Sequence, residues 1–151
     1  MKRARMIAIA VFATAIAVGC GTSNDDPLDG TAWAVELSTA CAAGLAFQGG
    51  GYRDLLLCSL TDGTIGLQEA NGTYEINGDR LTLHMDRASC NWLRDTATVS
   101  WEITGSGTLR LQDSSGIVVL ERLTSGGGSF VGTFGCFDDA GGFTLMPVHT
   151  L

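Results

Sequence analysis

Positive charge is scarce in this sequence. Lys2 is the single lysine, and sixteen acidic residues outnumber nine basic ones. Without residues 1–19, which are interpreted below as a signal peptide, six arginines face the sixteen acids, so the formal charge is about −10. Binding to a nucleic acid requires a basic patch that neutralises phosphates, and this composition therefore argues against a nucleic-acid partner.

The motifs of common enzyme and metal sites are also missing. The sequence has no Cys-x-x-Cys pair, and neither histidine, His84 or His149, stands at zinc-ligand spacing from a cysteine. It has no Gly-x-Ser-x-Gly nucleophile elbow. The triple glycines at 49–51 and 126–128 precede neither a helix nor a lysine, so they do not form phosphate cradles. We therefore expect a protein that is not an enzyme and that carries no metal or cofactor.

One apolar run near the start of the chain ends at a cysteine. Residues 1–5, MKRAR, are basic, and residues 6–18, MIAIAVFATAIAV, are uncharged. A basic segment, a short apolar segment and a small-residue end are typical of a secretory signal peptide. The run is shorter than the roughly 20 apolar residues of a transmembrane helix, and no second run of this length follows.

The end of this run, Ala17-Val18-Gly19-Cys20, resembles the lipobox of bacterial lipoproteins. The resemblance implies cleavage before Cys20 and acylation of Cys20 by palmitate-like chains, which would make the lipid bilayer a partner. The alternative is an ordinary signal peptide that is cleaved nearby. Two or three acyl chains anchor firmly, because each buried methylene contributes about 0.8 kcal/mol.

The lipoprotein resemblance divides the chain into three parts. They are a signal peptide over 1–19, a lipidated cysteine with a flexible tether over 20–29, and a folded domain over 30–151. The tether, GTSNDDPLDG after the cysteine, is polar and acidic and cannot bury apolar surface. The expected location is the bacterial cell envelope. There the protein would be held by lipid in the outer membrane and would face the periplasm or the cell surface.

Alternating apolar residues predict strands. Leu81, Leu83 and Met85 share one face of their segment, and Ala97, Val99, Trp101 and Ile103 share one face of theirs. Asn-Gly and Asp-Gly turns separate such segments. The expected strands are 31–40, 52–60, 64–69, 72–77, 80–87, 96–104, 107–113 and 117–123, with a further hairpin over 129–137 and 142–148. This pattern predicts an all-β protein, an antiparallel up-and-down meander barrel of about eight strands with an extra C-terminal hairpin.

Three segments resemble the small lipocalin-like domains of bacterial lipoproteins. They are LDGTAW at 28–33, NGTYEINGDRLTL at 71–83 and SGIVVLERL at 115–123. The resemblance covers Leu28 to Leu123 and implies a meander barrel. It also implies that Arg122 packs across the indole of Trp33 and closes one end of the barrel, which is a structural role.

Four further cysteines, Cys41, Cys58, Cys90 and Cys136, predict two disulfides in an exported chain. Strand direction alternates in a meander, so Cys41 and Cys90, after the expected first and fifth strands, should lie at the same end. The favoured pairing is therefore Cys41–Cys90 with Cys58–Cys136. Cys41–Cys58 with Cys90–Cys136 is a close alternative.

Two functions fit these expectations. The first is a binding module that holds a small hydrophobic ligand, although an eight-stranded barrel is narrow and its inward side chains can simply fill it. The expected lining residues are Trp33, Leu67, Tyr74, Leu83, Trp101 and Leu111. The second is an envelope protein that binds another protein, similar to anchored lysozyme inhibitors, or a purely structural envelope component. An exposed Trp92 in the 87–95 loop would favour a protein partner. We expect a monomer in either case.

Overall fold

The computed structural model of the chain describes residues 26–90, 96–124, 133–138 and 143–145. The expected signal peptide, Cys20, most of the tether, Trp92 and His149 lie outside the described residues. No helix within the described residues is long and apolar enough to cross a membrane.

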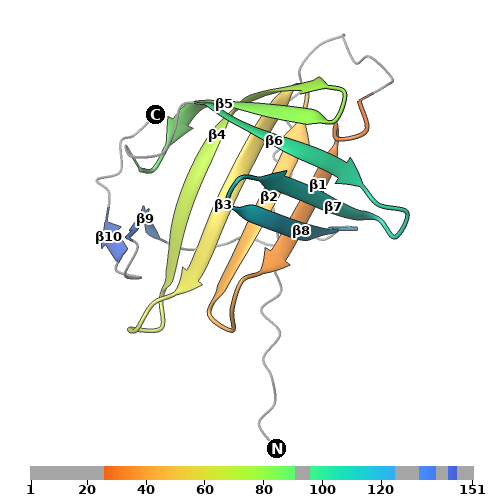
Figure 1. The fold of residues 1–151 in the computed structure, drawn as a ribbon. Coiled ribbons are helices and arrows are strands. Elements are labelled where there is room, and N and C mark those ends of the chain that lie inside the picture. The colour runs from red at the N-terminus through yellow and green to blue at the C-terminus, as the bar shows by residue number, and fades with distance from the viewer. Residues whose placement is uncertain (1–25, 91–95, 125–132, 139–142, 146–151) are drawn as a thin grey trace, which may run out of the picture.

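Eight antiparallel strands form a closed barrel, in which each strand pairs with the next and β8 returns to β1 (Figure 1). Its strands are β1 Thr31–Glu36, β2 Cys41–Gln48, β3 Gly51–Ser59, β4 Ile65–Asn77, β5 Arg80–Ala88, β6 Thr96–Ile103, β7 Thr108–Asp113 and β8 Gly116–Arg122. The expected all-β meander barrel is confirmed. The end of the barrel with turns 37–40, 60–64 and 114–115 is termed the mouth, and the opposite end is termed the closed end.

Two expected strand assignments are wrong, and they offset each other in the strand count. The segment CAAGLAFQ forms β2, although the sequence pattern predicts no strand there. Its small residues weaken the alternation signal, while Gly49 and Gly50, both at positive φ, make the tight turn into β3. The segments 64–69 and 72–77, which were expected to be separate strands, form one strand, β4. At Asn71 and Gly72 the register shifts by a β-bulge rather than a turn.

Large side chains pack together at the closed end. Trp33 and Leu28 are fully buried there, in a cluster whose other members are Leu45, Phe47, Tyr52, Tyr74, Leu81, Leu109 and Leu120. Leu28 precedes β1, and its carbonyl oxygen accepts a 2.5 Å hydrogen bond from Thr31 Oγ1. Tyr74 donates its hydroxyl to Asp26 Oδ2 at 2.6 Å, which fixes the segment before β1 against the barrel. This end is a conventional packed core.

A C-terminal hairpin lies outside the ring beside β4 (Figure 1). It consists of β9 Thr133–Phe137 and β10 Phe143–Leu145, and β9 pairs in parallel with the first residues of β4. Phe137 and Phe143 stack 4.7 Å apart against Gly66, where a larger residue would collide with both rings. The expected extra hairpin is therefore present within the described residues.

Both disulfides are present, but the favoured pairing is wrong. Cys41 bonds to Cys58, and Cys90 bonds to Cys136. Cys41 opens the missed strand β2 and lies directly opposite Cys58 on β3, with their Cα atoms 4.1 Å apart. The sequence-based prediction placed Cys41 after the first strand rather than at the start of the second. Cys58 was therefore not recognised as its cross-strand partner. The second disulfide ties the C-terminal hairpin to Cys90, which lies two residues beyond the end of β5.

Gly72→Ala is expected to destabilise the barrel. A Cβ atom at Gly72 would overlap the carbonyl oxygen of His84 on β5, and backbone atoms cannot move aside cheaply. Overpacking of this kind costs about 1–3 kcal/mol and sometimes more, so the free energy of unfolding in urea should fall by at least that amount. Gly105→Ala is the matched control, because a Cβ there meets nothing within 4 Å. Equal urea midpoints for the two variants would contradict this account.

Candidate functional site

Two adjoining cavities occupy the barrel toward its mouth. Their volumes are about 270 Å³ and 410 Å³, and both are lined by Asp54 and Leu83, so they meet at these residues. The larger cavity has mostly aliphatic walls, with Val35, Leu45, Val99, Leu111, Val118 and Leu120 among them. The smaller cavity adds polar atoms from Tyr52 and Gln68 and the thioether of Met85. Ligand sites in proteins have similar sizes, mostly apolar walls and a few polar groups.

Strand alternation explains why space remains at the mouth. The closed end receives Trp33, Phe47, Tyr52 and Tyr74 on its inward faces, whereas small residues face inward nearer the mouth. These small residues are Ala43, Ala70 and Ala97, and each of them lines one of the cavities. The small side chains fill less of the interior there, so the packed core ends and the cavities begin.

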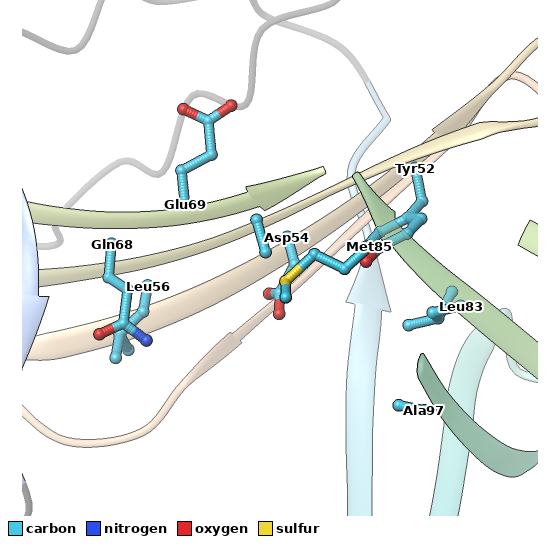
Figure 2. Close-up of a pocket in the computed structure, with 9 residues that line it drawn as sticks. Tyr52, Asp54, Leu56, Gln68, Glu69, Leu83, Met85 and Ala97 are labelled. Carbon is cyan, nitrogen blue, oxygen red and sulfur yellow. The ribbon is translucent and has the colours of Figure 1, made fainter. Parts of the chain in front are cut away.

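Asp54 is the acidic group common to both cavities. It lies on β3 with Leu45 of β2 and Ala70 of β4 as its cross-strand partners, so it shares the inward face. Figure 2 shows its carboxylate and the end of Met85 in the same space, while Glu69 points the opposite way. The side chain is accessible to water through the cavity yet surrounded by the barrel wall. Burial raises the pKa of Asp54 to about 6, against a hydrogen bond with the Leu55 backbone that lowers it.

No arginine within the described residues forms an ion pair with Asp54. Arg53 instead pairs with Glu69 at 2.6 Å on the outer face of β3 and β4, and Arg110 pairs with Glu102 at 3.1 Å. Within the described part of the chain, no three His, Cys, Asp or Glu side chains are grouped so that they could hold a metal ion. The cavities therefore offer mostly apolar contact, a few neutral polar side chains and the Asp54 carboxylate where they meet, with Asp113 at the edge of the larger cavity.

The expected lining residues are divided by the structure. Leu83 and Leu111 line the cavities. Trp33 and Tyr74 lie in the closed-end core, where they fill the barrel rather than line a cavity. Trp101 is half-buried against that core and donates its indole N–H to the Gly78 carbonyl oxygen at 3.2 Å, on the border of a shallow outer groove.

Leu67 was wrongly assigned to the interior. It packs with Leu55 and Leu57 in a separate cluster on the outer faces of β3 and β4. Leu67 and Tyr74 belong to the single strand β4, and their positions along it differ by seven, which is an odd number. They therefore face opposite sides of the sheet. Treating their segments as two strands had allowed both to point inward.

Arg122 and Trp33 lie together, as the resemblance implied. Arg122 Cζ is 5.7 Å from the centroid of the indole, and the two residues are cross-strand partners in the β1–β8 ladder. The indole N–H donates to Thr31 Oγ1 at 2.8 Å, so the ring is held by a hydrogen bond within the core as well as by the cation. A cation–π contact of this kind contributes about 0.5–2 kcal/mol.

Three lining residues, Asp54, Gln68 and Met85, are not among those expected from the sequence. A signal for Asp54 was present, because it alternates with Tyr52 and Leu56 in the segment YRDLLLC. The outward leucines, Leu55 and Leu57, are also buried, so both faces of β3 look apolar and the alternation does not show which face is inward.

Comparison with known proteins gives one structural likeness. No protein-family model and no curated protein matches the sequence. Among solved structures, a lipocalin-like protein from Bacteroides uniformis is 18% identical, with a TM-score of 0.44 over 62% of this chain and 96% of that chain. A likeness of this degree says nothing about function, so the fold rests on the strand pairing above and the function on the cavities.

Asp54→Asn is expected to raise the melting temperature near pH 7.5 and to change it much less near pH 4. The pKa of Asp54 in the folded protein, about 6, lies above its ordinary value of 3.8, so the folded state binds this proton more tightly than the unfolded state. The parent protein therefore loses stability from this group as the pH rises from about 4 to about 6, whereas asparagine cannot ionise.

Thermal melts at both pH values test this expectation. Asp62→Asn is the control, because hydrogen bonds from Thr64 lower the pKa of Asp62 and its replacement should not raise the melting temperature. A stabilisation by Asp54→Asn that is the same at both pH values would show that the charge is not its cause.

Proposed function

We propose that the barrel binds a small hydrophobic or amphipathic molecule in its mouth-side cavities. The observation that carries this proposal is the pair of adjoining cavities, which share Leu83 and have mostly apolar walls. A barrel whose inward side chains simply filled it would pack to the mouth as it does at the closed end. Apolar space of this kind takes up apolar molecules readily.

Leu83→Trp is expected to weaken binding strongly, because an indole at this position would extend into the space where the two cavities meet. Nile red is a suitable probe, since it is uncharged and its fluorescence increases in apolar surroundings. The experiment uses residues 21–151 with both disulfides formed, because the described barrel strands and their core all lie after residue 25. His84→Trp is the control, since His84 is the next residue along β5, faces outward and lines neither cavity.

Native mass spectrometry provides an independent reading of the same question. A small-molecule adduct that is retained by the parent and lost in Leu83→Trp would support a binding module. The proposal is contradicted if the parent protein leaves Nile red fluorescence unchanged and its mass shows no adduct.

The proposal includes a lipid anchor at Cys20. It is supported by the basic segment, the short apolar run and the lipobox-like residues 17–20. The acidic residues that follow would then act as a tether between the membrane and the barrel. The barrel would act at the envelope surface, within reach of molecules that partition between membrane and water.

Cys20→Ala is expected to release the protein from the membrane fraction of a bacterial host. The thioether that would carry the diacylglyceryl group is then absent, and one apolar signal segment does not replace two or three acyl chains. Membrane and soluble fractions are compared by immunoblot, with Cys41→Ala as a control for the loss of a cysteine elsewhere. Equal membrane retention of Cys20→Ala and the parent would contradict the anchor.

Binding of another envelope protein is the second candidate function. It is supported by apolar side chains exposed near the mouth: Leu37 is 55% exposed, Ile117 52%, Val118 44% and Val119 47%. Three of them are consecutive on β8, so they present apolar atoms on both faces of that strand. A mass without adducts in the experiment above would favour this candidate.

A further inference from the structure

The geometry points to an amphipathic amine as the ligand class for the mouth-side cavities, with the Asp54 carboxylate as the counter-charge for its ammonium group. This inference rests on the proposed binding function and names the chemistry of its ligand.

The position of Asp54 is the first argument. Its cross-strand neighbours on the inward face are Leu45 and Ala70, and Leu83 stands with it at the junction of the cavities. The carboxylate meets water in the open cavity, but the surrounding barrel wall makes its charged form less favourable than in free solution, and the Leu55 backbone offsets this only in part. The remaining acceptor positions of the two oxygens face the cavity. An ammonium group placed there would supply both the charge and the hydrogen-bond donors that the site lacks.

The other charges around Asp54 are the second argument. Asp113 of β7 lines the larger cavity. Asp86 of β5 lies close enough to raise the pKa of Tyr52, together with burial and Asp54 itself. Glu69 borders the smaller cavity but points outward to Arg53. β1, β2, β6 and β8 contribute no charged side chain to the lining of the two cavities. Among the described residues, the charged side chains that line the two cavities are thus all acidic, which favours a cation over a fatty acid or another anionic lipid.

The arrangement of apolar surface is the third argument. From Asp54 the larger cavity continues along aliphatic side chains, including Leu45, Val99, Leu111 and Leu120. A ligand with one charged end and an alkyl or aryl body can place its charge at Asp54 and its body along this wall. A compact hydrophilic amine would leave the wall without contact, so the inferred class is an amine with an apolar body.

Three matched probes test the inference: decylamine, decanol and decanoate, which share an alkyl chain and differ in charge. Their affinities are measured by displacement of Nile red from residues 21–151 near pH 7.5. Decylamine is expected to bind about tenfold more tightly than decanol, because its ammonium group adds a charge-assisted hydrogen bond to Asp54, and decanoate should bind most weakly. Asp54→Asn should remove the advantage of decylamine, whereas Glu69→Gln, which removes a charge on the outer face, should keep it.

A pH series on the parent protein gives a test that needs no variant. Alkylamines stay protonated below about pH 9, whereas Asp54 gains its proton as the pH falls through about 6. The advantage of decylamine should therefore shrink between about pH 7.5 and pH 5, while decanol affinity stays constant.

The outcomes separate the inference from the proposed function. If Nile red and all three probes fail to bind, the proposed function fails, and the inference with it. If decanol binds as tightly as decylamine, or if Asp54→Asn keeps the preference for the amine, the cavities bind apolar molecules but Asp54 is not the counter-charge. An amine preference that is lost in Asp54→Asn, kept in Glu69→Gln and reduced at low pH supports the inference.

Discussion

The barrel is closed by a very short ladder between β1 and β8, which is termed the seam. β1 and β8 share two backbone pairs, Trp33 with Arg122 and Ala34 with Glu121, whereas the other neighbouring strands of the eight-stranded ring share longer ladders. The inward Trp33 reinforces this seam because its indole is fully buried, hydrogen-bonded to Thr31 and covered by the Arg122 guanidinium. Only a closed sheet has an interior face that is separated from its exterior face. The core, the cavities and the inward position of Asp54 therefore all depend on this contact.

The packed core and the cavities lie at different ends of one barrel. Aromatic side chains and Leu28 fill the closed end, and a hydrogen bond from Tyr74 to Asp26 secures the segment that covers it. Nearer the mouth, small residues leave space, and a carboxylate stands where an aliphatic side chain would pack better. Natural proteins tolerate such locally unfavourable groups at binding sites because the rest of the fold supplies enough stability.

Strand alternation made the fold class readable from the sequence, and its ambiguities account for the errors. The segments around Leu81 and Trp101 alternate clearly and were placed correctly. β2 was missed because alanine and glycine carry little pattern, and this omission also hid the Cys41–Cys58 pairing. Leu67 was misplaced because a bulge at Gly72 resembled a turn. Asp54 was not predicted to line the interior because β3 carries apolar residues on both faces. The pairing of the closed ring is needed to show which face is interior.

The short seam also has a consequence for how the chain folds and diversifies. Every other ladder of the ring joins strands that follow each other in sequence, so most pairing is local and only the β1–β8 contact requires a long loop to close. The entropy of that closure grows only as the logarithm of loop length. Insertions in the turns at the mouth therefore add little to its cost, while the closed end and its seam stay as they are. The loops around the cavity opening can therefore vary in length while the β1–β8 pairing that closes the barrel stays the same.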